Sequence, residues 1–495
     1  MQVSQLFAIY PEYRLGDHPE VEVHKLTFDS RNIEPNDVFI AVRGQNFDGH
    51  SVLKEVVENK PAALVVEDIQ SVPEDFVGAV VVVSNTREAL ARLAHRFYGE
   101  PSHDLFCVGV TGTNGKTSVT YMIEKILTDF GWPTGVMGTV DHHLGGRTWP
   151  TNLTTPDPIT ITRRLVEMQA VGARAIVMEV SSHALSQFRA HGIAFDVGVF
   201  TNLTRDHLDY HSSMEDYFAS KEILFSSLLG NSHKGSRAAV VNVDDMWGAQ
   251  IQVSGGSKRV GYGKAAHHLK LSLQRMDFSG TRFQLSVHDE EYNGFIPVPG
   301  DYSVYNACAA IGACMHAGVS IASCLKSLES FDGVPGRLQR VENKSAGYAF
   351  VDYAHTDDAL RSVLNVLQDI RRFSKDNHRI HLVFGCGGDR DKGKRPLMMD
   401  AAMAGADFVY VTSDNPRTEE PQKIIDDIIA NTPKSLIEDK VMIEVDRKKA
   451  IEQALRNADQ GDVVIVAGKG HEDYQIIGTE KHHFSDQEVI EEFSG

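Results

Sequence analysis

One glycine-rich segment, TGTNGKT at residues 111–117, constrains the fold of this chain more than any other feature. An apolar run typical of a buried strand (105–110) precedes it, and residues 116–130 follow with apolar side chains at helical spacing. In such a strand–loop–helix the backbone N–H groups and the helix N-terminus hold phosphates, a lysine reaches the terminal phosphates, and a threonine hydroxyl binds Mg²⁺. The segment predicts a phosphate site at the carboxyl edge of a parallel α/β sheet.

The segment departs from the general phosphate-loop pattern GxxxxGK[ST], because Val110 stands where that pattern has its first glycine. A glycine-rich turn that binds nothing is the alternative interpretation. The preceding strand and the Lys-Thr pair at the helix start favour phosphate binding. The predicted phosphate contacts are Gly112, Thr113, Asn114, Gly115, Lys116, Thr117 and Ser118.

A length of 495 residues predicts about three domains. Turn-rich breaks at 99–102 and 331–336 place a small α/β domain at 1–100, a central parallel-sheet phosphate-loop domain at 101–334, and a doubly wound Rossmann-like domain at 335–495. The fold class is α/β. Strands are expected at 37–42, 62–67, 79–84, 105–110, 173–180, 196–201, 238–243, 380–385, 407–412, 441–444 and 462–467, and helices at 86–98, 116–130, 394–404, 420–430 and 447–458.

Charge and composition narrow the functional classes. A net charge of −18 argues against a nonspecific nucleic-acid binder, which needs a basic surface. The apolar runs fall short of the roughly 20 residues that cross a bilayer, and the opening residues lack a signal-peptide pattern, so we expect a soluble, unexported protein without membrane insertion. Five scattered cysteines without a CxxC pair fit a reducing cytoplasm. Cys386, in GCGG, is better explained as a small packed residue than as a nucleophile.

Three further residues are ambiguous when taken alone. Glu179 ends one predicted strand and His207 follows another, so both belong at the carboxyl edge that carries the phosphate loop. They could hold Mg²⁺ there, although Mg²⁺ prefers oxygen ligands and a single histidine is more often a surface or core residue. Lys221, on a predicted amphipathic helix, is by default a solvated charge.

Ordered motifs over nearly the whole chain resemble the Mur ligases. They are DSR (29–31), DGH (48–50), TGTNGKT, EVSSHAL, TNLTRDHLDYH, YFASKEILF, GVPGRLQRV, VDYAHTDDAL, GCGGDRDKGKRP, SDNPR and AGKGHEDYQ. The resemblance is strongest to the members that add the third residue of the peptidoglycan stem peptide. It implies ATP-dependent amide formation through an acyl phosphate, with ATP and Mg²⁺ as cofactors.

The resemblance also assigns roles to residues. Lys116, Lys221 and His207 would be catalytic, and Thr117, Glu179, His207 and Lys221 would hold Mg²⁺, Lys221 as a carbamate formed from CO₂. Nucleotide contacts would come from Asn306, Arg337, Asp352 and His355, with closure of the third domain onto the second. Family members commonly carry an asparagine where this chain has Ser303. The UDP-sugar peptide would be bound by Ser30, Thr154, Thr155, Ser181, Gln187 and Arg189.

The identity of the amino acid that is added as the third residue is inferred from the motif DNPR at residues 414–417. Asn-Pro alone is a turn signal, but in this family DNPR marks enzymes that add meso-diaminopimelate, whose second carboxylate suits an arginine fork. The implied contacts are Arg390, Asp414, Asn415, Pro416, Arg417, Gly468 and Glu472. The expected partners are UDP-N-acetylmuramoyl-dipeptide and meso-diaminopimelate, bound by a cytoplasmic monomer. The alternatives are the L-lysine-adding ligase, a folylpolyglutamate synthetase-like ligase, and a phosphate-loop switch that makes no bond.

Overall fold

The computed structural model describes residues 1–10, 20–44, 47–151, 153–207, 210–288, 290–344, 347–374 and 377–493. The chain forms two compact units, one of Met1–Ala266 with Ala309–Ser320 and one of His267–Cys308 with Ile321–Gly495. One of the three breaks between the units falls inside helix α8 (Asp301–His316), whereas the domain boundaries predicted from the sequence lie near residues 100 and 334. Those domain boundaries stay a prediction. In the described part of the chain, no helix combines the length and apolar character needed to span a bilayer.

The first unit opens with a small parallel sheet of order β1-β2-β3-β4. Both faces are covered, because Val38 and Ile40 pack with Leu90 of α3 while Phe39, between them, packs with Leu53 of α2. Burial on both faces explains why these strands are continuous apolar runs. The elements are α1 (Val3–Phe7), β1 (Leu26–Thr27), η1 (Ser30–Asn32), β2 (Val38–Ile40), η2 (Gly49–Val52), α2 (Leu53–Glu58), β3 (Ala63–Val66), η3 (Ile69–Ser71), β4 (Ala79–Val82), α3 (Thr86–Phe97) and η4 (Pro101–His103).

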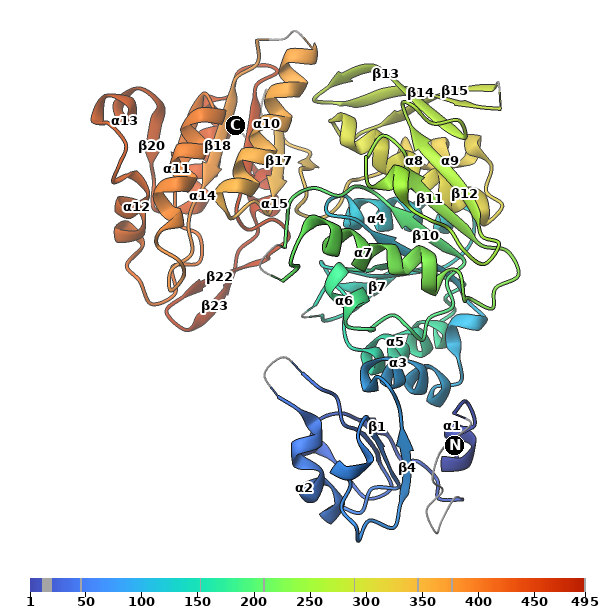
Figure 1. The fold of residues 1–495 in the computed structure, drawn as a ribbon. Helices are drawn as coiled ribbons and strands as arrows, with labels where there is room; N and C mark the ends of the chain where they lie inside the picture. Colours follow the sequence, from blue (N-terminus) through green and yellow to red (C-terminus); the bar gives the residue numbers. More distant parts are fainter. Residues whose placement is uncertain are drawn as a thin grey trace. The chain divides into compact units, whose positions relative to one another are not determined.

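The larger sheet of the first unit has the order β12-β11-β10-β5-β9-β6-β7-β8. β5 lies between β9 and β10, and these three strands run parallel, so Thr111, Glu179 and Phe200 end at one edge. Figure 1 labels β10, β11 and β12 of this sheet. The elements are β5 (Phe106–Thr111), α4 (Lys116–Asp129), β6 (Thr134–Met137), β7 (His142–Leu144), β8 (Arg147–Trp149), α5 (Pro158–Ala170), β9 (Ala175–Glu179), α6 (Ser182–Ser186), β10 (Val197–Phe200), α7 (Met214–Ile223), η5 (Leu224–Leu228), β11 (Ala238–Asn242), η6 (Gly248–Gln250) and β12 (Lys258–Gly263).

The second unit combines an antiparallel meander with a sheet of order β16-β17-β21-β18-β19-β20. In that sheet only β16 is antiparallel to its neighbour among the described strands. The elements besides α8 are β13 (Leu269–Asp277), β14 (Gly280–Val287), β15 (Glu290–Ile296), α9 (Ile321–Leu328), β16 (Gln339–Val341), β17 (Tyr348–Asp352), α10 (Asp357–Ser374), β18 (Ile380–Phe384), α11 (Lys394–Gly405), β19 (Phe408–Val411), α12 (Pro421–Ile429), α13 (Lys434–Lys440), β20 (Val441–Ile443), α14 (Arg447–Asn457), β21 (Val463–Ala467), β22 (Tyr474–Ile477), β23 (Glu480–His483) and α15 (Asp486–Glu492).

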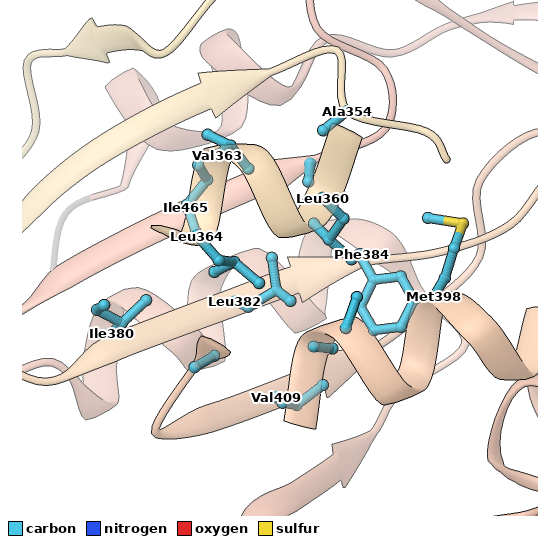
Figure 2. Packing of buried hydrophobic residues seen from close by; sticks show 14 of the residues in the cluster. Ala354, Leu360, Val363, Leu364, Ile380, Leu382, Phe384, Met398, Val409 and Ile465 are labelled. Atoms are coloured by element: carbon cyan, nitrogen blue, oxygen red, sulfur yellow. The ribbon is translucent and has the colours of Figure 1, made fainter. Parts of the chain in front are cut away.

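Helices cover both faces of this second sheet, as the doubly wound prediction requires. Leu382 and Phe384 of β18 face Leu360 of α10 and Met398 of α11 (Figure 2), while Val383 between them packs in a separate cluster with α14 and α15. The predicted α/β class with parallel sheets is confirmed. The larger sheet of the first unit is not purely parallel, however, because the β7–β8 hairpin extends it beyond β6 in antiparallel fashion.

Candidate active site

The glycine-rich loop connects β5 to α4 and needs its glycines for steric reasons. Gly112 has a φ of 148°, and a Cβ there would overlap with the Thr201 hydroxyl. Gly115 lies in the left-handed region, with a φ of 86°, immediately before α4. The amide of Asn114 donates to the Asn202 side-chain oxygen at 3.0 Å, which ties the loop to the segment after β10. Ser118, the remaining predicted contact, lies half-buried in the first turn of α4.

Two lysines converge on this loop. Lys116 donates from Nζ to the carbonyl oxygens of Gly112 (3.0 Å) and Thr113 (2.8 Å). Lys221, from α7, is only 1% exposed and donates to Gly112 O at 2.9 Å, with its Nζ 4.4 Å from the ring centroid of Tyr217. Burial, together with the charge of Lys116, holds the pKa of Lys221 well below its ordinary value. The interpretation of Lys221 as a solvated helix charge is therefore wrong.

Glu179 ends β9 beside the start of α4 and is 1% exposed. Its Oε1 accepts hydrogen bonds from the Thr117 hydroxyl (3.0 Å) and the Thr139 amide (2.8 Å), and its Oε2 from the Thr139 hydroxyl (3.1 Å). A Cβ on Gly138 would overlap with Oε1, so the carboxylate sits directly against this backbone. A hydroxyl and a carboxylate side by side at the phosphate loop are the hard oxygen donors that suit Mg²⁺.

His207 lies at the rim of this cluster. It has a φ of 53°, and its side chain is 46% exposed. The ring lies 4.9 Å from that of His183 and 6.0 Å from that of Tyr217, whose hydroxyl is hydrogen-bonded to Thr113 Oγ1 at 3.2 Å. Within the described ranges, no three His, Cys, Asp or Glu side chains are arranged to hold a metal ion. Among the described residues His207 forms no hydrogen bond or ion pair with Glu179, and its ring reaches the loop only by way of the Tyr217 ring.

Five of the six predicted contacts for the UDP-sugar peptide lie around the end of β9. The Thr155 hydroxyl donates to Glu179 O at 2.8 Å and accepts from the Ser181 amide at 3.1 Å. Thr154 Oγ1 lies 3.1 Å from the Thr139 hydroxyl, which in turn bonds Glu179. The structure thus brings these hydroxyls together beside the carboxylate.

Arg189 continues this network. Its Nη1 donates to Thr155 O at 2.8 Å and its Nη2 to Gln187 Oε1 at 2.7 Å, while Gln187 Nε2 donates to the Tyr210 hydroxyl at 3.2 Å. Burial lowers the pKa of Arg189 from its ordinary value. Five of the six predicted contacts therefore form one connected polar cluster.

Ser30, the sixth, lies elsewhere in the first unit. It begins η1 beside the Asp29–Arg31 ion pair, whose atoms are 2.8 Å apart, and no hydrogen bond among the described residues joins Ser30 to the Thr155 cluster. The DGH motif has a local structural role, because His50 bonds Asp48 at 2.7 Å and accepts from the amide of Glu67 at 2.9 Å.

In the second unit, three predicted nucleotide contacts surround Tyr353. Asp352, at the end of β17, accepts from the amides of Leu338 (2.7 Å) and Ala354 (2.8 Å), and burial raises the pKa of its carboxyl. The guanidinium of Arg337 lies 5.6 Å from the Tyr353 ring, and the ring of His355 lies 4.7 Å from it.

Asn306 is buried on α8. Ser303, one turn earlier, donates from its hydroxyl to Gly300 O at 2.5 Å and Val298 O at 2.9 Å. The side chain at the position where the family commonly has an asparagine is thus committed to local backbone.

The two predicted amino-acid-binding segments lie against each other after β19 and β21. Asn415 Nδ2 donates to Glu472 Oε2 at 3.1 Å. Lys469, whose side chain is fully buried, lies 3.3 Å from Asn415 Oδ1 and 3.5 Å from Glu472 Oε2. Gly468 has a φ of 116°, and a Cβ there would come 2.9 Å from Asp414 Oδ2. Lys469 was not predicted, although it stands inside the AGKGHEDYQ motif.

Arg417 lies beside Arg390 on the same side of this region. Arg417 has a φ of 52°, its amide donates to Ile476 O at 3.0 Å, and its Nη1 donates to Gly388 O at 2.8 Å. A Cβ on Gly387 would lie 3.0 Å from Arg417 Nη1 and 3.7 Å from Arg390 Cγ. Pro416 is buried and Arg390 is exposed. Arg417 Nη1 and the Arg390 side-chain stem thus both lie beside the Gly387 backbone, where a Cβ would crowd them.

The thiol of Cys386 is buried, lies 3.5 Å from Met398 Sδ, and has its pKa raised to about 12 by burial. A protonated, packed thiol does not act as a nucleophile. Sequence reasoning also missed Tyr217 and Thr139. Tyr217 precedes Lys221 by four positions, so helical spacing would have indicated it. No local signal marks Thr139.

A glycine-rich loop between a parallel strand and a helix, with Lys116 and Thr117 at the helix start and Glu179 ending the next strand, defines a phosphate-loop nucleotide-binding protein of the α/β class. Three family sequence models match this chain: the Mur ligase family catalytic domain over residues 22–98, the Mur ligase middle domain over 110–314, and the Mur ligase glutamate ligase domain over 336–470. The chain belongs to the Mur ligase family.

Relatives extend this match over nearly the whole chain. The UDP-N-acetylmuramoyl-L-alanyl-D-glutamate--2,6-diaminopimelate ligase of Aquifex aeolicus is 41% identical, covering 96% of this chain and 94% of its own. The ligase of the same name from Lactiplantibacillus plantarum is 41% identical, with 99% and 97% covered. A solved structure of a ligase of this name matches with a TM-score of 0.75 at 30% identity, covering 99% of this chain and 98% of that one.

More distant structures share the fold alone. MurF from Acinetobacter baumannii has a TM-score of 0.60 at 20% identity, with 94% of this chain and 95% of that one covered. The folylpolyglutamate synthase of Mycobacterium tuberculosis has a TM-score of 0.56 at 16% identity, with 77% and 92% covered. The folate-ligase alternative is therefore the weaker one.

Proposed function

We propose that this protein is an ATP-dependent ligase that joins meso-diaminopimelate to UDP-N-acetylmuramoyl-L-alanyl-D-glutamate in peptidoglycan precursor synthesis. Relatives about 40% identical over nearly the whole chain bear the name of that ligase. The structural observation that supports it is the joining of Asn415 to Glu472 beside Arg417 and Arg390. A carboxylate and two guanidinium groups complement an amino acid that presents ammonium and carboxylate groups.

The chemistry requires activation of a carboxylate, which is a poor electrophile. ATP supplies the phosphoryl group that converts the carboxylate to an acyl phosphate with release of ADP, and the amine then bonds the acyl carbon as phosphate leaves. Lys116 and the loop amides would hold the phosphates and offset their repulsion of the substrate carboxylate. Thr117, Glu179, His207 and a carbamate on Lys221 would hold Mg²⁺, which neutralises charge during phosphoryl transfer.

We propose that Lys221 carries this carbamate. A neutral amine adds CO₂ and loses a proton, which gives the N-carboxylate anion. The burial of Lys221 and its lowered pKa support the proposal, because they increase the share of neutral amine. The modification also removes a buried positive charge next to Lys116.

The deciding experiment measures ADP release with UDP-N-acetylmuramoyl-L-alanyl-D-glutamate and each candidate amino acid. We expect turnover only when ATP, the acidic acceptor and meso-diaminopimelate are all present. Turnover with L-lysine instead would assign the lysine-adding ligase, and turnover with a folate and glutamate the folate ligase. ATP hydrolysis that needs neither acceptor nor amine would indicate the phosphate-loop switch.

We further propose that the enzyme acts as a monomer in the cytoplasm. All five cysteines are free thiols, which fits a reducing compartment. Light scattering of the purified protein tests the monomer.

A further inference from the structure

Arg447, the first residue of α14, is a buried charge that the reaction chemistry does not use. It is 2% exposed, and its side chain pairs in bidentate fashion with the fully buried Asp486, Nε to Oδ1 at 2.7 Å and Nη2 to Oδ2 at 2.8 Å. Its other donors meet backbone: Nη2 lies 3.0 Å from Ala467 O, and Nη1 lies 3.3 Å from Ser413 O. The guanidinium thus joins one carboxylate to two main-chain carbonyls.

These carbonyls belong to the residues that immediately precede the two amino-acid-binding segments. Ser413 comes directly before Asp414, and Ala467 directly before Gly468. The strands involved, β19 and β21, are separated in the sheet by β18, so no ladder hydrogen bond connects them. Arg447 supplies a link between two loop starts that the sheet itself does not join.

Arg447 also interacts electrostatically with acidic residues of the two amino-acid-binding segments. Burial lowers the pKa of its guanidinium, but the charges of Asp486, Asp414 and Glu472 raise it by more. A buried ion pair of this kind often adds little stability compared with apolar packing, while loss of one partner leaves an uncompensated charge. The Arg447–Asp486 pair is therefore better explained by its positioning of the two segment starts than by a contribution to the stability of the fold.

We propose that Arg447, held by Asp486, is a positioning residue for the amino-acid substrate. It fixes the start of Asp414–Arg417 relative to the start of Gly468–Glu472, so that both segments meet one amino acid. This inference rests on the proposed function, because it takes those segments as the amino-acid site. Displacement of either start would weaken amino-acid binding and leave the phosphate loop, which belongs to the other unit, unaffected.

The test compares Arg447→Met, Arg447→Lys and Asp486→Asn with Arg371→Met. The control removes an arginine that pairs with Asp407 at 2.7 Å, at the amino end of β19 in the same sheet. KM is measured separately for the amino acid, ATP and the UDP-dipeptide, and thermal unfolding verifies the fold. We expect Arg447→Met and Asp486→Asn to raise the amino-acid KM about 10- to 100-fold, the effect of losing a charge-assisted hydrogen bond. KM for ATP should stay within about twofold.

Arg447→Lys, which keeps the charge but not the planar fork, should recover part of the loss. The control should leave all three KM values near those of the parent. An unchanged amino-acid KM in a folded Arg447→Met, or equal rises in all three KM values, overturns the proposal. If Arg447→Met does not fold, Arg447→Lys and Asp486→Asn decide by the same criterion. If the parent enzyme turns over L-lysine instead, only the diaminopimelate assignment is refuted. The role of Arg447 is then tested by the same variants through their KM for L-lysine.

Discussion

Lys116 and Lys221 donate to the same acceptor, the carbonyl oxygen of Gly112, at 3.0 and 2.9 Å. Two ammonium groups this close, one of them buried, disfavour each other's charge. The pKa of Lys221 is lowered for this reason, because burial and the charge of Lys116 are the two largest causes of the shift. Conversion of Lys221 to an anion would replace repulsion with attraction.

Lys221→Ala should therefore reduce ligation by roughly 100-fold or more, the usual effect of removing a group that stabilises developing charge. Formate or acetate should restore part of the activity, because a small carboxylate can occupy the space of the missing carbamate. The measurement is ADP release with and without added formate. Lys125→Ala, which removes a half-buried lysine that pairs with Asp129 on α4, should behave as the parent. Full activity of Lys221→Ala without formate would refute the role.

Lys116→Ala should abolish ATP-dependent ligation and leave the fold intact. The Lys116 side chain is half-buried and donates to the carbonyl oxygens of Gly112 and Thr113, so its removal takes away polar contacts of the loop and no part of the apolar core. Ligation and the thermal unfolding midpoint are measured together, again with Lys125→Ala as control. Near-normal turnover in a verified Lys116→Ala protein would refute the phosphate-loop assignment.

Three strands that the sequence predicted in the second unit share one physical property. β18, β19 and β21 are buried on both faces, so each is a short apolar run that stands out from its surroundings. The meander was missed because β13 has one exposed face, and its alternating pattern is weaker than a continuous run. β7 and β8 span three residues each, and each carries only one large apolar residue among histidine, arginine and threonine, which is too short a pattern to indicate a strand.

Some parts of the candidate site could also be predicted from the sequence, and others could not. The glycine-rich loop is local, and the position of Glu179 beside it follows from the rule that parallel strands end at one edge. The role of Lys221 could be predicted only from the family resemblance, because helical spacing alone suggests an exposed lysine. Thr139 and Arg447 reach their partners only through tertiary contacts, Arg447 pairing with a residue 39 positions away, and short-range pattern does not encode such contacts.

His143 should make stability depend on pH. It lies between Asp141 (2.6 Å) and Glu124 (3.0 Å), and although burial acts to lower its pKa, these two carboxylates raise it to about 9. A folded-state pKa above the unfolded value of about 6.5 stabilises the fold fully below pH 6.5, and this contribution disappears as pH rises through about 9. At about 1.4 kcal/mol for each pKa unit, it amounts to at most about 3 kcal/mol.

His143→Gln should therefore be less stable than the parent at pH 6, and the difference should shrink by about pH 10. Thermal unfolding midpoints across this range give the measurement. His482→Gln, at an exposed histidine, should follow the parent at every pH. A difference between His143→Gln and the parent that stays constant with pH would show that packing, and not charge, accounts for it.

Arg417 should determine the choice of meso-diaminopimelate over L-lysine. The two amino acids differ by one carboxylate, and Arg417 is half-buried with Nη1 donating to Gly388 O at 2.8 Å, which leaves further donors of the fork for a substrate carboxylate. A site built to pair a charge can reject an analogue that lacks it by on the order of 10⁴, because the arginine would otherwise stay desolvated and alone.

Arg417→Ala should therefore lower kcat/KM for meso-diaminopimelate far more than for L-lysine. Alanine removes the guanidinium and keeps the backbone hydrogen bonds to Ile476 and Gly478 that hold this turn. The measurement is kcat/KM for both amino acids in the parent, in Arg417→Ala and in Arg456→Ala, where the control loses an exposed arginine that lies over Phe493. A parent that prefers L-lysine, or a ratio unchanged in Arg417→Ala, would remove the substrate assignment while leaving the ligase assignment in place.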